Sequence, residues 1–240
     1  MSFPFSSKLL LIANVVTCVI LVMVWRNRDA WEHKYTNLQK LPDPTTYRYS
    51  ENPNYTEQVE FEQHYSLPKR IIFLGTSRSA RIQWDELLQR NDVFNAGIGS
   101  DITEGMLHRL SLLYPKQPTV VFLEAGINDI VLGLPAGKII HAYRRIVDSL
   151  QQHQLQLVLQ TIVPVTLSMK GSLRINEGVY LLNEYIRQLA QQKHCSFVDV
   201  ASRISYQGFL RPEFAQADGI HLNAAAYQIW KEQITPLLTP

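Results

Sequence analysis

The chain has 240 residues, of which 46% are hydrophobic, and its 23 lysines and arginines nearly balance its 21 aspartates and glutamates. This length and composition suit one well-buried globular domain plus a smaller element. The lack of a basic run in the sequence argues against nucleic acid as a partner, and the two cysteines, Cys18 and Cys195, are too few for a disulfide framework.

The N-terminal part carries an uncharged apolar run, residues 9–25, after a short tail of residues 1–8. The run is close to the minimum length for a membrane-spanning helix, and no small-x-small cleavage site follows it, so we predict an uncleaved single-pass anchor. Lys8 precedes the run and Arg26 and Arg28 follow it, which slightly favours a cytoplasmic domain on the positive-inside rule. Long domains can cross the membrane regardless of flanking charge. We therefore expect a single-pass membrane protein whose main domain lies outside the cytoplasm.

Residues 26–69 combine proline, asparagine, tyrosine and charged residues without a sustained apolar period. We predict a spacer between the anchor and a main domain of residues 70–240. The tyrosines of this segment could instead pack on the surface of that domain, and the pattern leaves both possibilities open.

Beyond residue 69, short apolar runs alternate with amphipathic stretches. The runs expected to form strands are residues 71–75, 93–97, 119–126, 155–163 and 195–200. The stretches expected to form helices are residues 82–90, 103–114, 137–152, 176–193 and 224–238. This alternation predicts a doubly wound α/β domain with a mainly parallel five-stranded sheet and helices on both faces.

Four segments near the predicted strand ends carry polar residues, and ligands of such sheets bind beyond the carboxyl ends of the strands. They are Gly75-Thr76-Ser77, "NAGIGSD" at 95–101, "GIND" at 126–129 and "DGIH" at 218–221. Each segment alone is typical of a helix cap or a turn. The four segments together, rather than any one of them, indicate a catalytic site.

Serine acyl chemistry requires a nucleophile, a base, a group that orients the base, and donors for an oxyanion. Ser77 is the candidate nucleophile, His221 the candidate base and Asp218 its orienting carboxylate. The backbone amides at Gly99 and Ser100 are candidate oxyanion donors.

Three further side chains complete the list of candidate site residues. The side-chain amide of Asn128 is a candidate oxyanion donor. Arg78 and Arg81 lie one helical turn apart beside Ser77, where they could bind an anionic substrate group or pair with nearby carboxylates.

With these motifs, residues from about 69 to 238 resemble the SGNH/GDSL hydrolases. Ser77 matches the nucleophile block of that family, residues 126–129 match its GxND motif, and Asp218 and His221 match its DxxH motif. The chain departs from the family at two positions. Thr76 stands where the family has an acidic residue, and Ser100 stands where it has its usual oxyanion glycine.

The resemblance implies a serine esterase with a flavodoxin-like fold and a small-molecule, glycan or lipid ester as substrate. O-acetylated sugars, acyl lipids and thioesters are all substrates within that family. An O-acyltransferase acting on cell-envelope glycan, or an inactive binding module of the same fold, remains an alternative. The sequence has no HExxH, paired CxxC or P-loop pattern, so we expect no metal and no cofactor. Nothing in it indicates an oligomeric state.

Overall fold

The computed structural model of the chain describes residues 47–65 and 67–238. Its centre is a sheet of five short strands: β1 (Ile71–Gly75), β2 (Val93–Gly97), β3 (Val120–Leu123), β4 (Gln156–Gln160) and β5 (Ser196–Val198). The strand order is β2-β1-β3-β4-β5 and every neighbouring pair is parallel. The predicted α/β class and the five-stranded parallel sheet are therefore confirmed.

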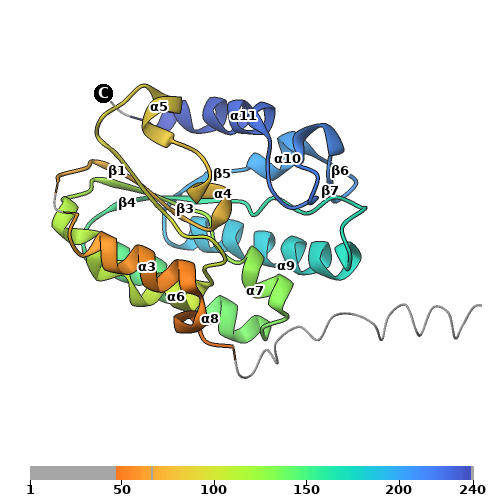
Figure 1. Cartoon of the computed structure of the whole chain (residues 1–240), viewed down its shortest axis with the longest axis horizontal. Helices are drawn as coiled ribbons and strands as arrows, with labels where there is room; N and C mark the ends of the chain where they lie inside the picture. The colour runs from red at the N-terminus through yellow and green to blue at the C-terminus, as the bar shows by residue number, and fades with distance from the viewer. Residues whose placement is uncertain (1–46, 66, 239–240) are drawn as a thin grey trace, which may run out of the picture. The chain divides into compact units, whose positions relative to one another are not determined.

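Alternate residues of the central strands belong to two separate cores, one on each face of the sheet. Helices cover both faces (Figure 1). Ile72 and Leu74 of β1 pack toward α6 (Thr103–His108), α8 (Ala136–Gln152) and α9 (Ser172–Gln192). Ile71 and Phe73 pack toward α5 (Trp84–Leu88), α10 (Val200–Ile204) and α11 (Ala224–Ile234). Strands buried on both faces form continuous apolar runs, which is why they were visible in the sequence.

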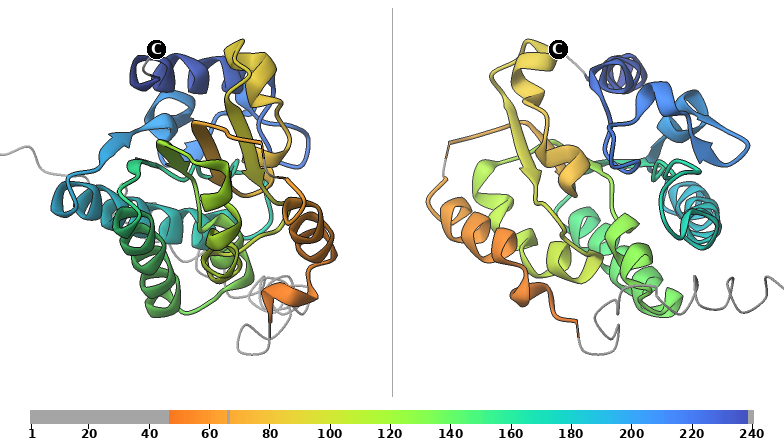
Figure 2. Two further views of the ribbon diagram at one scale, coloured as in Figure 1. Left: turned by 90° about the vertical axis from the view of Figure 1, so that its left-hand side faces the viewer. Right: turned by 45° about the vertical axis from the view of Figure 1, so that its right-hand side comes forward.

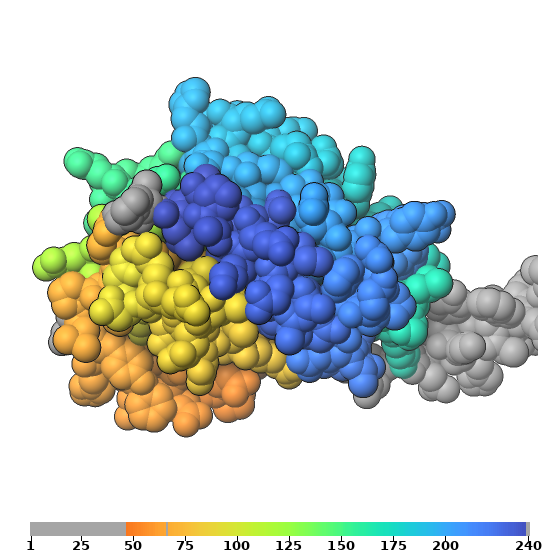
Figure 3. Space-filling view, turned by 90° about the horizontal axis from the view of Figure 1, so that it is seen from above, coloured from red at the N-terminus to blue at the C-terminus, as the bar shows by residue number. Residues whose placement is uncertain are grey.

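Aromatic rings pack α5 against the sheet and against α11. The Trp84 ring stacks on Phe73 with centroids 3.9 Å apart, and its edge meets Trp230 of α11 at 5.2 Å. Figure 3 shows the yellow surface of the α5 region against the blue C-terminal segment. This packing holds together two segments that are distant in the sequence.

Several elements differ from those predicted. The expected helix 103–114 ends at His108 and continues as two 3-10 turns, Leu110–Leu112 and Tyr114–Lys116. The α-helix does not continue because Arg109 has φ at −103° and ψ at 7°, outside the right-handed helical region. α7 (Ile127–Leu132) and the hairpin of β6 (Ser205–Tyr206) and β7 (Phe209–Leu210) were not predicted.

The described part of the predicted spacer packs on the domain. It forms a 3-10 turn, Tyr49–Glu51, and a helix, α3 (Pro53–Glu62), which lies alongside α6 (Figures 1 and 2). Tyr55 is buried and its hydroxyl donates to the Gly105 carbonyl oxygen at 3.1 Å. The described residues 47–65 therefore pack against the predicted main domain, as the alternative for the tyrosines of this segment had allowed.

No helix within residues 47–65 and 67–238 combines the length and the apolar character needed to cross a membrane. The predicted tail, the predicted anchor at residues 9–25 and the first part of the predicted spacer lie outside the described residues.

Candidate active site

Ser77 is the first residue of the short helix α4 (Ser77–Ala80), directly beyond the carboxyl end of β1. Thr76 caps this helix, since its hydroxyl oxygen accepts a hydrogen bond from the Arg78 amide at 3.4 Å. A Cβ atom at Gly97 would overlap the backbone nitrogen of Ala80, so α4 lies directly on the end of β2. These contacts place the Ser77 hydroxyl at the edge of the sheet where ligands bind.

The structure brings Ser77, His221 and Asp218 together, although the serine and the histidine are 144 residues apart. Ser77 Oγ lies 3.0 Å from His221 Nε2, and His221 Nδ1 lies 2.5 Å from Asp218 Oδ2. Oδ1 of the same carboxylate accepts hydrogen bonds from the amides of His221 at 2.9 Å and Ile220 at 3.0 Å. The arrangement allows a proton to pass from the hydroxyl to a ring whose other nitrogen is held by a carboxylate.

Hydrogen bonding keeps the Asp218 carboxylate ionised. Partial burial acts to raise the pKa of Asp218, but the bonds from the His221 amide and ring and from the Ile220 amide outweigh it and lower this pKa to about 2. The carboxylate is therefore negative at neutral pH and can stabilise a positive charge on the imidazole.

The candidate oxyanion donors belong to the same cavity as Ser77. Asn128 is in the first turn of α7, which begins after Gly126, whose φ of 119° favours glycine. One N–H of the Asn128 amide donates to the Asp101 carbonyl oxygen at 2.8 Å, which orients the group. Gly99, Ser100 and Asn128 all line the cavity that contains Ser77 and His221.

Ser100 has a left-handed backbone, with φ at 60°. This conformation favours glycine, the residue that the family has at this position. Within residues 47–65 and 67–238, the Ser100 amide donates to no protein acceptor, so it is free to bind a ligand oxygen.

Arg78 does not reach the cavity, which corrects its prediction as a substrate-binding residue. Its side chain is buried, with 1% of the residue exposed. Nε and Nη2 donate to the Ile220 carbonyl oxygen at 3.1 and 2.9 Å, while Nη1 and Nη2 donate to the carbonyl oxygens of Val163 at 2.5 Å and Pro164 at 3.3 Å. Arg78 therefore fixes the loop that carries His221.

Arg81, in contrast, lines the cavity and is half exposed. Its Nη1 donates to Gln216 Oε1 at 3.2 Å and lies 4.0 Å from Asp218 Oδ2. The position is compatible with the predicted contact to an anionic substrate group, and also with the alternative of pairing with a nearby carboxylate.

The first departure from the family motif has a structural counterpart. The Thr76 hydroxyl donates to Oε2 of the buried Glu124, just beyond β3, at 2.9 Å. Burial raises the pKa of Glu124, while the charge of Arg78 and the hydrogen bonds from Thr76 oppose this shift. A buried carboxyl group from the segment just after β3 therefore contacts position 76, where the family has an acidic residue.

The cavity has a volume of about 640 Å³ and one of its walls is α3. Four α3 residues that the sequence did not indicate contribute to it: Asn54, Glu57, Gln58 and Phe61. Their segment has no apolar period and carries no motif, so the sequence contained no signal for this role.

Buried charges connect α3 to the same region. Arg109 Nε lies 2.9 Å from Asp101 Oδ2, Arg109 Nη1 lies 3.7 Å from Glu62 Oε2, and all three side chains are fully buried. Burial raises the pKa of Asp101, against the opposing effect of Arg109. The carbonyl of Asp101 is the one that orients Asn128, so this network lies next to the candidate oxyanion donors.

Asp129, the last residue of the GIND motif, has a structural role. Its carboxylate is buried and accepts hydrogen bonds from the Thr103 amide at 3.1 Å and the Thr103 hydroxyl at 2.6 Å. Burial raises the pKa of Asp129 to about 6, although the bonds from Thr103 act to lower it. This contact joins the start of α6 to α7.

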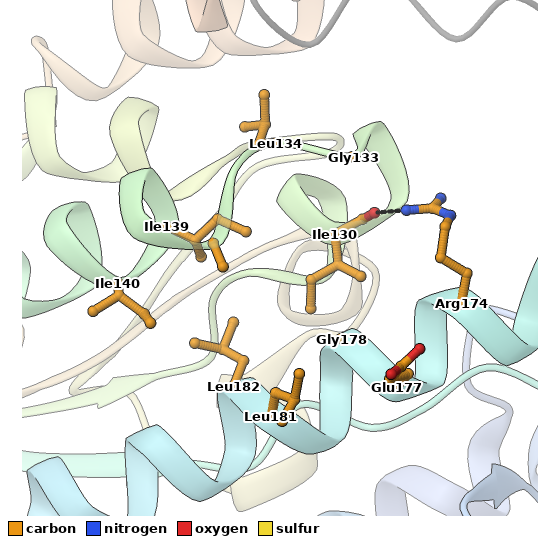
Figure 4. Close-up of a pocket in the computed structure, with 11 residues that line it drawn as sticks. Ile130, Gly133, Leu134, Ile139, Ile140, Arg174, Glu177, Gly178, Leu181 and Leu182 are labelled. Carbon is orange, nitrogen blue, oxygen red and sulfur yellow. Dashed lines mark hydrogen bonds between the residues drawn. The ribbon is translucent and has the colours of Figure 1, made fainter.

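A second, apolar cavity of about 310 Å³ lies between α7, α8 and α9 (Figure 4). Ile130, Leu134, Ile139 and Leu182 are among its lining residues, and Arg174 donates to the Ile130 carbonyl oxygen at 3.0 Å on its rim. None of the candidate site residues line it. No group of three or more His, Cys, Asp or Glu residues that could hold a metal ion occurs in the described part of the chain.

Comparison with solved structures shows the same fold in other proteins. The chain is 18% identical to a GDSL-like lipase from Bacteroides thetaiotaomicron, with a TM-score of 0.67 over 77% of this chain and 96% of that one. It is 22% identical to the psychrotrophic esterase EstA from Pseudoalteromonas sp., with a TM-score of 0.56 over 70% and 98% of the two chains. A third match is TesA, at 24% identity and a TM-score of 0.56, over 71% of this chain and 100% of that one. The curated proteins include no match to the chain.

The sequence profile of the GDSL-like Lipase/Acylhydrolase family matches residues 70–229, which defines the class as lipases and esterases. The chain belongs to this family, and the resemblance predicted from its motifs is confirmed. It is accordingly an ester hydrolase.

Proposed function

We propose that the protein is a membrane-anchored serine esterase that hydrolyses O-acetyl or other acyl esters with Ser77, His221 and Asp218. The observation that carries the proposal is the continuous contact from Ser77 Oγ through the His221 ring to the Asp218 carboxylate, at 3.0 and 2.5 Å. A helix-capping serine would need neither of these partners.

In the proposed reaction, Ser77 Oγ attacks the ester carbonyl carbon as its proton moves to His221 Nε2. The tetrahedral intermediate collapses, the bond to the alcohol oxygen breaks, and the alcohol leaves with the proton from Nε2. Water then attacks the acyl-serine, again giving its proton to His221, and the acid is released as Ser77 regains a proton. The ionised Asp218 holds the ring in position and stabilises its positive charge in both steps.

The negative oxygen of each tetrahedral intermediate would be bound by the amide of Ser100 and the side chain of Asn128, with the adjoining Gly99 amide as a further donor. All three residues line the Ser77 cavity, and the Ser100 amide has no acceptor among the described residues. Losing one such donor typically lowers the rate by about 100- to 1000-fold.

The α3 wall favours an ester of a polar alcohol. Hydrogen-bonding groups reach the cavity from α3, at Asn54, Glu57 and Gln58, and from Arg81 at the end of α4. Short acyl esters of sugar hydroxyls fit this lining better than long-chain lipid esters. We expect kcat/KM to fall as the acyl chain of a test ester is lengthened, and a rise with chain length would contradict this choice of substrate.

The test of the catalytic assignment uses the purified full-length protein and a small acetyl ester. Turnover should be lost in Ser77→Ala and His221→Ala, while the surface variant Ser202→Ala should keep wild-type activity. The Pseudoalteromonas esterase was solved with monoethylphosphonate as its inhibitor, so a phosphonate probe followed by peptide mapping should label Ser77. Absence of turnover together with an unlabelled Ser77 would refute the proposal, and acyl transfer to an added glycan would identify a transferase.

The membrane anchor is proposed from the sequence. Residues 9–25 are uncharged and apolar, with Lys8 before them and Arg26 after them. We expect the full-length protein to remain in washed membranes, with its hydrolase domain outside the cytoplasm, and a chain lacking residues 1–28 to be released. Recovery of the full-length protein in the soluble fraction would rule the anchor out.

A further inference from the structure

Residues 98–101, which carry the Ser100 amide, form a tight β-turn. The Asp101 amide donates to the Ile98 carbonyl oxygen at 3.3 Å, which closes the turn. Gly99, its second residue, has no positive φ, whereas Ser100, its third, has φ at 60°. The signs of these two φ values match those of a type II turn, in which the third position is usually glycine.

A serine in that position favours a different turn. Type I and type II turns differ in the orientation of their central peptide, and φ of the third residue is about −90° in type I and about +80° in type II. Rotating the Gly99–Ser100 peptide would therefore relieve the left-handed backbone of Ser100. The same rotation would turn the Ser100 N–H away from its present direction.

One side chain opposes this rotation. Nδ2 of Asn52, the residue that caps α3, donates to the Gly99 carbonyl oxygen at 2.8 Å. Asn52 is buried, with 5% of the residue exposed, and does not line the Ser77 cavity. The described residues contain no cis peptide, so the N–H of Ser100 points opposite to the carbonyl that Asn52 holds. Asn52 therefore binds the side of this peptide that lies opposite the Ser100 N–H.

We propose that Asn52 is a positioning residue that keeps the Gly99–Ser100 peptide in the type II orientation, with the Ser100 N–H directed at the substrate oxygen. The inference rests on the proposed esterase function, to which it adds a residue that touches neither the substrate nor the reacting side chains. It also gives the α3 segment a role in the reaction beyond forming a wall.

The two ends of the Asn52 amide can be tested separately. Its Oδ1 accepts the Asn54 amide at 3.1 Å as the helix cap, whereas its Nδ2 makes the bond to Gly99. Asn52→Asp keeps a good cap but cannot donate to the carbonyl. If the peptide rotates fully, kcat for a small acetyl ester should fall by about 100- to 1000-fold with little change in KM. Asn52→Ser, which also caps but is too short to reach Gly99, should behave in the same way if the buried carboxylate unfolds the first variant.

Rescue distinguishes positioning from a general packing defect. Glycine has no preference against a positive φ, so adding Ser100→Gly to Asn52→Asp should restore roughly tenfold or more of the lost kcat. The control Thr56→Ala removes an exposed hydroxyl that donates to the Pro53 carbonyl oxygen in the same turn of α3, and should leave kcat unchanged. A folded Asn52→Asp with wild-type kcat, or a loss that Ser100→Gly does not repair, would overturn the proposal.

A crystal structure of Asn52→Asp tests the proposal without relying on turnover. The proposal expects a rotated Gly99–Ser100 peptide and a negative φ at Ser100, and an unchanged peptide would refute it. A failure of the esterase function itself would instead be seen in the wild-type protein, as absent turnover and an unlabelled Ser77. The two failures are therefore distinguishable.

Discussion

Replacing Arg78 with lysine tests whether this residue holds the His221 loop or binds substrate. The change keeps the positive charge but removes the planar guanidinium fork. That fork makes four hydrogen bonds to three carbonyl oxygens, those of Val163, Pro164 and Ile220. Ile220 directly precedes His221, so a change at Arg78 acts on the base through the backbone.

The size of the effect follows from the partners that lysine cannot keep. Its single nitrogen cannot reach three carbonyls on two separate segments, and those of Val163 and Pro164 belong to buried residues. Lysine leaves at least two of these carbonyls without a partner, and each buried polar group without a partner costs about 1–3 kcal/mol, so we expect the free energy of unfolding to fall by about 2–6 kcal/mol. Displacement of the base by about 1 Å would lower kcat by up to roughly 100-fold.

The assay combines urea denaturation with steady-state kinetics on a neutral acetyl ester and on an ester carrying a negative group. Arg81→Lys is the matched control, because Arg81 is exposed and lines the cavity, and its free energy of unfolding should change by less than about 0.5 kcal/mol. If Arg78→Lys unfolds like the wild type and only its KM for the anionic ester rises, Arg78 contacts substrate and the assignment to the loop is wrong.

Three further predictions concern the site and its surroundings. Asn128→Ala should lower kcat by about 100- to 1000-fold through the loss of an oxyanion donor, and a single-turnover rate close to wild type would contradict its role. Hydrogen bonding lowers the pKa of Asp218 from 3.8 to about 2, so between these values the unfolded chain binds a proton that the folded protein does not. The contribution of Asp218 to the free energy of unfolding should therefore decrease as pH falls through this window, and an unchanged pH dependence in Asp218→Asn would argue against this. Burial raises the pKa of Asp129 from 3.8 to about 6, so between these values the folded protein binds a proton that the unfolded chain has released. The contribution of Asp129 to the free energy of unfolding should therefore decrease as pH rises through this window, and Asp129→Asn should flatten the pH dependence measured by urea denaturation. Parallel curves for the two proteins would disprove this.

The sheet and most of its helices were predictable because their signals are local. Buried parallel strands require several apolar residues in succession, and β1, with all five residues buried, shows this directly. The motif residues were predictable for a different reason, since the carboxyl ends of parallel strands converge at one edge whatever their separation along the chain.

α3 could not be predicted because its attachment is non-local and mostly polar. Only Tyr55 and Glu62 of this helix are buried. Its anchors are the contacts of Asn52 with Gly99 and of Glu62 with Arg109, each between residues 47 positions apart in the sequence. No apolar period reveals contacts of this kind.

The burial of Arg78 is a similar case. An arginine is rarely buried without partners, and here the partners are backbone carbonyls 85 and 142 residues further along the chain. Backbone groups have no residue identity in a sequence, so the pattern beside Ser77 could suggest an exposed cation but not this interior role.

The packing of α3 also bears on how the protein should be produced. The family match begins at residue 70, so a fragment for expression could be designed to start at that position. A chain trimmed there would lack the Glu62 carboxylate and the Tyr55 ring, and would uncover Arg109 and the underside of α6. We expect such a fragment to be insoluble, whereas one that keeps residues 47–69 would retain the turn Tyr49–Glu51 and α3.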